Sequence, residues 1–128
     1  MNLLIDTHVL LWAACDSPKL SKAASDLLLD PASSLFFSPA SLWEITIKNA
    51  LGRKDFQVDP RAFRQGLLEN DYVEVPITSL HAINVDMLPP IHKDPFDRIL
   101  LSQAVQEGLS LVTADRMLAQ YSGPVLAV

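Results

Sequence analysis

Short apolar segments alternate with longer helix-like segments along this chain of 128 residues, and this alternation constrains its fold more than any other feature. Several of the short segments are almost continuously apolar, which is typical of strands buried on both faces of a parallel sheet. We predict five strands, at Asn2–Ile5, Ser34–Phe37, Tyr72–Val75, Leu109–Thr113 and Val125–Val128. Alternating strands and helices predict an α/β fold around a mainly parallel sheet.

The helices between these strands carry recognisable start and end signals. The start signal is a capping residue directly before a proline, whose missing N–H has no partner at the first helical position. It occurs at Ser38-Pro39, Asp59-Pro60 and Asp94-Pro95. Gly52 and Gly108 stand where C-terminal caps belong. These signals predict helices over Pro39–Ala50 and Pro95–Glu107.

The chain shows no internal repeat, low-complexity tract or flexible linker, so we expect one domain over residues 1–128. Asp6 interrupts the apolar segment Met1–Ile5 before it has the length of a signal peptide or membrane span. Cys15 is the only cysteine, which excludes an internal disulfide and a cysteine-based zinc site. We therefore expect a cytoplasmic protein with no membrane partner.

The formal net charge of −5 at first argues against a nucleic-acid partner. The basic residues are unevenly placed, however, and five of them fall within seventeen positions: Lys48, Arg53, Lys54, Arg61 and Arg64. A solvated helix surface explains this cluster more simply than an RNA-binding groove does. Charge alone therefore decides nothing about the partner.

Two acidic residues follow predicted central strands. Asp6 ends the first strand, and Asp115 comes directly after the fourth, in the segment Leu111–Asp115. Open α/β sheets place their ligand sites beyond the carboxyl ends of the strands, so both side chains are expected at the same edge of the sheet. Each could also be an ordinary turn or N-cap residue.

Two further acids belong to helices that start near that edge. Glu44 lies in the second turn of Pro39–Ala50, and Asp97 lies in the first turn of Pro95–Glu107. Glu44 could instead form an ion pair with Lys48 four residues later, and Asp97 could interact favourably with the positive end of the helix dipole. These explanations require four independent coincidences and do not explain why all four acids face one edge. On the first helix, the apolar residues at helical spacing predict a buried stripe: Trp43, Ile47, Ala50 and Leu51.

A cluster of carboxylates implies a bound cation, because neighbouring carboxylates repel one another. Oxygen ligands without cysteine or a clear histidine spacing favour Mg²⁺, with Mn²⁺ as a substitute. We expect Asp6, Asp97 and Asp115 to be the principal ligands, with Glu44 binding metal or orienting the attacking water. Thr113 could hold a metal-bound water, although a strand-end cap explains it more simply.

The motifs around these acids resemble those of the PIN domains, and specifically the VapC-type toxins of bacterial toxin–antitoxin pairs. The matching segments are Leu3–Trp12, Ser38–Ile45, His92–Ala104 and Leu111–Asp115, in the order in which the family has them. The resemblance spans essentially the whole chain. It implies a three-layer α/β/α fold, Mg²⁺-dependent endoribonuclease activity, homodimers and a cognate antitoxin. It also matches Asp6, Glu44, Asp97 and Asp115 to the family's acidic positions, and Thr113 to a supporting hydroxyl.

Other residues near the motifs are weaker candidates for the functional site. Asp94 is a candidate for a peripheral metal or water contact, but helix capping is its better-supported role. Arg98 and Arg116 follow two of the acids and could meet a phosphate, although salt bridges explain them equally well. For His8 and His92, local packing or capping is the simpler interpretation.

Two other classes of function remain open. A phosphate-handling α/β enzyme or receiver domain has a similar layout, but a receiver also needs an aspartate after the third strand and a lysine after the fifth. Here Pro76-Ile77-Thr78 follows the third strand, and no lysine follows the last one. A haloacid-dehalogenase-type phosphatase needs a second aspartate at the position of His8. A catalytically silent PIN-like binding module is the other alternative, and DNA is an alternative substrate.

Overall fold

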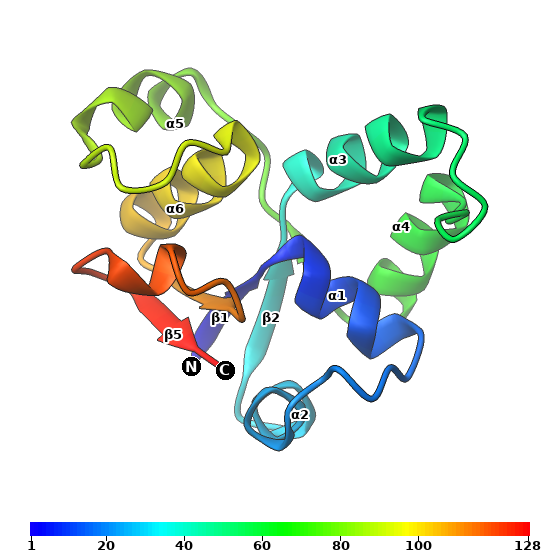
Figure 1. Cartoon of the computed structure of the whole chain (residues 1–128). Coiled ribbons are helices and arrows are strands. Elements are labelled where there is room, and N and C mark those ends of the chain that lie inside the picture. Colours follow the sequence, from blue (N-terminus) through cyan, green and yellow to red (C-terminus); the bar gives the residue numbers. More distant parts are fainter.

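The computed structural model describes residues 1–128 and contains one five-stranded sheet in which every strand pairing is parallel. The strand order is β3-β2-β1-β4-β5 (Figure 1). The strands are β1 Asn2–Ile5, β2 Ser34–Phe37, β3 Val73–Glu74, β4 Ser110–Thr113 and β5 Val125–Ala127. The helices are α1 Thr7–Ala14, α2 Lys22–Leu29, α3 Pro39–Ala50, α4 Pro60–Glu69, α5 Ser79–Asn84 and α6 Pro95–Glu107, with short 3₁₀ helices η1 Val85–Met87 and η2 Leu118–Gln120.

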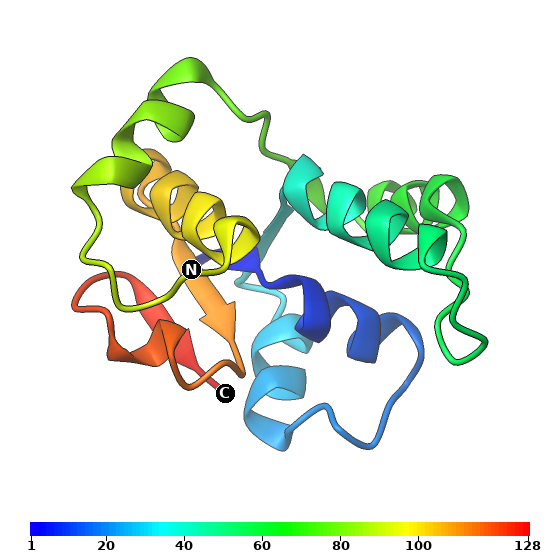
Figure 2. The same ribbon diagram turned by 45° about the horizontal axis from the view of Figure 1, so that its top comes forward.

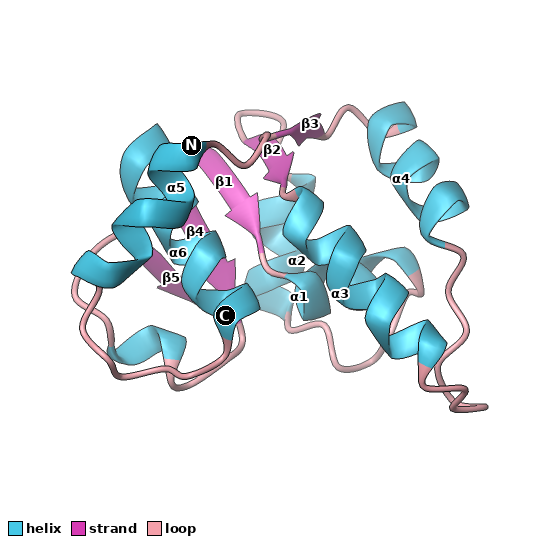
Figure 3. Ribbon diagram, turned by 90° about the horizontal axis from the view of Figure 1, so that it is seen from above, coloured by secondary structure: helices cyan, strands magenta, loops and turns pink.

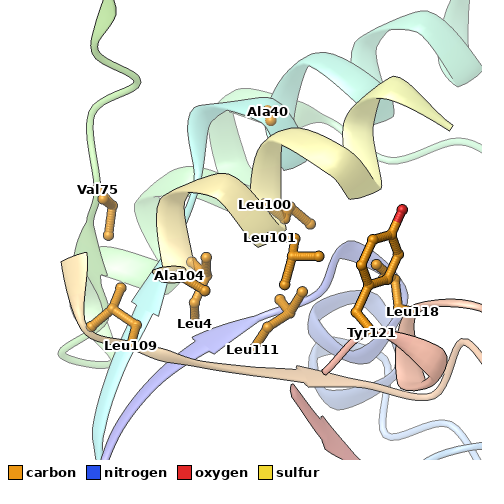
Figure 4. Close-up of a cluster of buried hydrophobic side chains, with 10 residues drawn as sticks. All are labelled: Leu4, Ala40, Val75, Leu100, Leu101, Ala104, Leu109, Leu111, Leu118 and Tyr121. Atoms are coloured by element: carbon orange, nitrogen blue, oxygen red, sulfur yellow. The ribbon is translucent and has the colours of Figure 1, made fainter. Parts of the chain in front are cut away.

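The predicted three-layer α/β/α arrangement is confirmed, because alternate side chains of the central strands enter two separate cores. Leu4 of β1 packs with α6 on one face of the sheet, where Leu100, Leu101 and Ala104 cover it (Figure 4). Leu3 and Ile5 face the other way, into a core that α1, α2 and α4 supply with Val9, Leu10, Ala24 and Leu67. Burying each such leucine stabilises the fold by about 1.5–3 kcal/mol, so the central strands are fixed from both sides.

The predicted capping signals explain where the longest helices begin and end. The side chain of Ser38 accepts a hydrogen bond from the N–H of Ala40 at the start of α3 (3.0 Å), and Asp94 accepts from Phe96 at the start of α6 (2.9 Å). Gly108 ends α6 with φ +67°, a conformation that glycine adopts without steric cost. The predicted bounds of α3 and α6 agree with the structure.

The third strand is shorter than the predicted Tyr72–Val75, because only Val73–Glu74 forms a regular ladder. Val75 still donates a backbone hydrogen bond to Phe37 (2.9 Å) and is buried. Pro76 follows directly and has no N–H to continue the pairing.

The predicted buried stripe of α3 is wrong. Trp43 is 63% exposed and Leu51 is 68% exposed, and Ile47 and Ala50 are exposed as well. The buried face of α3 instead consists of Ala40, Ser41, Glu44 and Ile45. Trp43 lies on another face of the same turns, and Figure 3 shows that α3 meets the sheet only with its first turns and then runs away from it. None of the helices in the chain combines the length and the apolar character that crossing a membrane requires.

The strand order reverses its direction beside β1. From β1 the chain proceeds through β2 and β3 toward one edge of the sheet, whereas β4 and β5 lie on the other side of β1. In open α/β sheets, ligands bind outside the carboxyl ends of the strands where the order reverses in this way. Here that point lies between β1 and β4, and Asp6 and Asp115 follow these two strands.

Candidate active site

Asp6 lies at the junction of β1 and α1, where it is 3% exposed. One carboxylate oxygen, Oδ1, accepts the N–H of His8 and caps α1 (3.1 Å). The other, Oδ2, accepts a hydrogen bond from the hydroxyl of Thr113 at the end of β4 (2.5 Å). Burial raises the pKa of Asp6 and the nearby charge of Glu44 adds to this effect, while the bonds from Thr113 and His8 oppose it. The net shift is upward, so burial outweighs the hydrogen bonds that favour the charged form of this carboxylate.

Asp115 is held in its charged form by its hydrogen bonds. Its Oδ1 accepts from the N–H groups of Met117 (2.7 Å) and Leu118 (3.2 Å), and its Oδ2 lies 3.1 Å from Nε2 of His92. Partial burial acts to raise its pKa, but the hydrogen bonds outweigh that effect and the net shift is downward. Its own N–H donates to the hydroxyl of Thr113 (3.0 Å), so Thr113 joins Asp115 to Asp6.

Asp97 lies in the first turn of α6, whose N-terminus points toward the turn between β1 and α1 (Figure 2). Its Oδ2 is 3.0 Å from Nε2 of His92. Burial raises the pKa of Asp97 to about 7, and the charges of Asp6 and Asp94 push in the same direction. A carboxylate with such a pKa binds a proton near neutrality unless a cation replaces that proton.

Glu44 extends from the buried face of α3 and is 8% exposed. Its Oε2 lies 3.4 Å from the ammonium group of Lys48, so the predicted pair four residues apart is present. Glu44 also acts on the pKa of Asp6 through its charge, which places it at the same cluster. Lys48 in turn lies 3.4 Å from Nε2 of His8, at the exposed rim of the site.

The structure therefore brings the four predicted acids, with Thr113 among them, to the carboxyl edge of the sheet. The predicted capping role of Asp94 is present, and its charge also acts on Asp97. Arg98 is held away from the cluster, because its guanidinium donates to the backbone carbonyls of Val85 (2.9 Å) and His92 (3.2 Å). Arg116 is exposed and forms no ion pair.

Sequence reasoning allowed that His92 could tune the metal site but favoured local packing or capping, and so underestimated its place in the site. Its ring is nearly buried and lies between Asp97 and Asp115, and one nitrogen and two carboxylate oxygens of these three residues lie within 4.8 Å of one another. The contact with Asp115 joins residues 23 positions apart, which no local spacing reveals. The available signal was its place five residues before Asp97, on the segment that leads into the helix carrying that acid.

The donor set fits a hard divalent cation. Apart from the imidazole of His92, the groups available are carboxylate oxygens, which Mg²⁺ and Mn²⁺ prefer. Burial raises the pKa of both Asp6 and Asp97, so a cation bound at this place would stabilise their charged forms. Asp6, Asp97 and Asp115 are the residues that would hold such a cation, with Glu44 beside them.

Comparisons with known proteins agree with this geometry. The family model of the PIN domain matches residues 3–124. The chain is 28% identical over 123 residues to Ribonuclease VapC22 of Mycobacterium tuberculosis, a match that covers 96% of this chain and 94% of that protein.

Solved structures show the same fold. VapBC2 from Rickettsia felis, bound to a DNA fragment from its promoter, matches with a TM-score of 0.73 at 16% identity and covers 99% of this chain and 98% of that one. DNA-bound VapBC from Salmonella typhimurium matches with a TM-score of 0.69 at 15% identity and covers the same shares. A toxin–antitoxin complex from Klebsiella pneumoniae gives 0.66 at 17% identity, covering 98% and 96%.

Proposed function

Because this chain belongs to the PIN domain family, we propose that it is a Mg²⁺-dependent endoribonuclease and the toxin of a toxin–antitoxin pair. The observation that carries the proposal is the convergence of Asp6, Glu44, Asp97 and Asp115 at the carboxyl edge of the sheet, where burial raises the pKa of both Asp6 and Asp97. The relative from Mycobacterium tuberculosis is named a ribonuclease, which supports RNA as the substrate. The strand order β3-β2-β1-β4-β5 differs from the order 2-1-3-4-5 of receiver domains, which disfavours that alternative.

Each residue has a defined part in phosphodiester hydrolysis. Asp6, Asp97 and Asp115 would hold the cation. Once bound there, Mg²⁺ would supply charge stabilisation at the phosphoryl group and the leaving oxygen and would lower the pKa of a bound water. Thr113 fixes Asp6 through its hydroxyl, and Glu44 orients the attacking water from the α3 side.

Only some of the basic residues are free to contact the RNA backbone. Within the predicted cluster, Arg53 pairs with Asp55 (2.7 Å) and Arg64 pairs with Glu74 (3.1 Å). Lys48 lies at the rim of the acidic cluster, and we assign it the phosphate contact nearest the site. We assign Arg116 a phosphate contact because it is exposed and unpaired. The guanidinium of Arg98 is instead bound to backbone carbonyls, so we assign Arg98 an anchoring role.

An apolar groove in the structure suits an antitoxin segment. A cavity of about 650 Å³ opens between α1, α2 and α4, and its lining is mainly apolar, including Leu10, Leu28, Phe63 and Leu67. Leu10 in this lining belongs to α1, the helix that starts directly after Asp6. We infer that an amphipathic antitoxin segment docks here and that an antitoxin arginine reaches the carboxylates. The similar solved structures are toxin–antitoxin complexes, which supports this inference.

The exposed apolar residues of α3 and α5 suit a homodimer. Trp43 packs edge-on against Phe96, yet 63% of its surface is exposed, and Leu80 and Ile83 of α5 are about as exposed. The same patch on two copies would form a closed twofold contact. We expect Trp43→Asp to yield a monomer in analytical ultracentrifugation, while wild-type protein sediments as a dimer.

Incubation of the purified protein with RNA tests the activity. We expect cleavage with Mg²⁺ or Mn²⁺ and none with EDTA, and single-stranded DNA of the same sequence serves as the control for substrate class. Cleavage that persists in EDTA would contradict metal dependence. A protein that cuts no RNA under any of these conditions and also binds no Mg²⁺ in calorimetry would instead support the silent binding module.

A further inference from the structure

We propose that His92 does not ligate the metal but is a fixed hydrogen-bond donor that positions the metal-binding carboxylates of Asp115 and Asp97. This inference rests on the proposed function, because it assigns His92 a part in the same site. The distances alone would suggest the opposite, that His92 is itself a metal ligand, because its nitrogen and the oxygens of both acids lie close enough to surround one ion.

The two ring nitrogens of His92 have different surroundings. Only Nε2 faces the carboxylates, so Nε2 is the atom that would have to ligate a metal. A ligating nitrogen must offer a free electron pair, which places the ring proton of a neutral imidazole on Nδ1. A ligand role for His92 therefore requires a protonated Nδ1.

The backbone on the other side of the ring forbids that arrangement. The N–H of Asp94 points at Nδ1 of His92 and donates to it at 3.0 Å. With a proton on Nδ1, two N–H donors would point at each other, and the Asp94 N–H would have no acceptor. Nδ1 therefore accepts, and the ring proton resides on Nε2, which donates to Oδ2 of Asp115 and faces Oδ2 of Asp97.

The segment around His92 is held at both ends, so the Asp94 N–H cannot easily turn away. Asp94 caps α6 through Phe96 (2.9 Å) and precedes Pro95, whose φ is fixed by its ring. The backbone N–H of His92 donates to the hydroxyl of Tyr121 (2.9 Å), and its carbonyl accepts from Arg98 (3.2 Å). The conformation of this loop thus decides which nitrogen of His92 carries the proton.

His81 offers an internal reference with the same pattern of bonds outside the site. Its Nδ1 accepts the N–H of Thr78 (2.9 Å), and its Nε2 lies 3.0 Å from Oε1 of Glu107. His81 is buried between α5 and α6 and takes no part in the acidic cluster. The chain has only three histidines, so their ring signals can be assigned individually.

The direct test is a long-range ¹H–¹⁵N spectrum of the histidine rings in wild-type protein, recorded in EDTA and then with saturating Mg²⁺. We expect His92 to show the same pattern as His81, with a protonated Nε2 and a bare Nδ1, in both states. A protonated Nδ1 in His92, or an Nε2 that loses its proton when Mg²⁺ is added, would overturn the proposal. The spectrum in EDTA does not depend on activity. A protein that cuts no RNA but shows the expected pattern would therefore contradict the proposed nuclease activity and still support the assignment of His92 as a donor.

Two variants test the positioning role through Mg²⁺ affinity in calorimetry. His92→Leu removes the donor, and we expect it to weaken Mg²⁺ binding about 10–100-fold, the usual effect of losing a partner that orients metal ligands. His92→Gln keeps an N–H group near the position of Nε2 and is expected to retain most of the affinity. Thermal unfolding in EDTA shows whether each variant is folded. Wild-type affinity in the leucine variant, or equal losses in both folded variants, would contradict the role.

Discussion

The hydroxyl of Thr113 lies 2.5 Å from Oδ2 of Asp6, and this hydrogen bond links the ends of the two central strands across 107 positions of sequence. Both residues are almost fully buried. The same hydroxyl accepts the N–H of Asp115, so it aligns two of the three proposed metal ligands at once. Thr113 therefore connects the ends of the central strands to the proposed metal ligands.

Replacing Thr113 by valine tests that link. Thr113→Val keeps the shape of the side chain but leaves Oδ2 of Asp6 and the Asp115 N–H without a partner, which is expected to lower the free energy of unfolding by about 1–3 kcal/mol. Thr113→Ser, which keeps the hydroxyl, is the matched control. Urea unfolding in EDTA measures both variants, and Mg²⁺ titration should show weaker binding only in the valine variant. Equal stability and metal affinity in the two variants would contradict the role of the hydroxyl.

The raised pKa of Asp97 predicts that the metal-free protein loses stability as the pH rises. The pKa is about 7 in the folded protein and 3.8 for an unperturbed aspartate, so between these values the folded state binds more protons than the unfolded state. The free energy of unfolding should therefore fall from about pH 4 to pH 7, by about 2 kcal/mol once screening by solvent is allowed for. Asp6, whose pKa is also raised, adds to the same slope.

Urea unfolding in EDTA at several pH values across this window measures the effect. Asp97→Asn should flatten the slope without removing it, and should be more stable than wild type at about pH 8, where the wild-type carboxylate is charged. With saturating Mg²⁺ the advantage of the variant should disappear. Stability that increases with pH in EDTA over this window would show that the site lacks the charge repulsion described here.

Asp94 caps α6 and also carries a charge that acts on Asp97, and two substitutions separate these two effects. Asp94→Ala removes the acceptor for the Phe96 N–H and is expected to destabilise the protein by about 1 kcal/mol. Asp94→Asn keeps a capping oxygen but removes the charge that raises the pKa of Asp97. The asparagine variant should therefore match wild-type stability near pH 4 and show a shallower pH slope. The same slope in wild type and Asp94→Asn would exclude the electrostatic effect of Asp94.

The parts of the fold that sequence predicts well are those with local signals. The Asp94-Pro95 pair and Gly108 define both ends of α6, and the apolar segment before Asp6 defines β1. Once the strands are known to be parallel, the position of Asp6 and Asp115 at one edge follows from topology alone. This explains why the convergence of the acids was predictable without any contact information.

The misassigned features depend on contacts that no local pattern contains. The stripe of α3 has the spacing of a buried face, but periodicity cannot distinguish a core from a surface that another chain covers. Trp43 lies in the same turn as the buried Glu44 and Ile45 but on another face of α3, and only the first turns of α3 meet the sheet. His92 and Arg98 obtain their roles from partners on other elements, Asp115 and Val85, and such pairings are visible only after folding.

The most direct test of the central claim is the rate of RNA cleavage by Asp97→Asn in saturating Mg²⁺, beside wild type and Asp86→Asn. Asp86 is an exposed acid on η1 outside the cluster, so it controls for the loss of one negative charge. We predict that Asp97→Asn lowers the rate by more than about 100-fold, the scale of removing one group that stabilises transition-state charge, while Asp86→Asn cuts at the wild-type rate. Cleavage by Asp97→Asn at the wild-type rate would contradict the assignment of the active site.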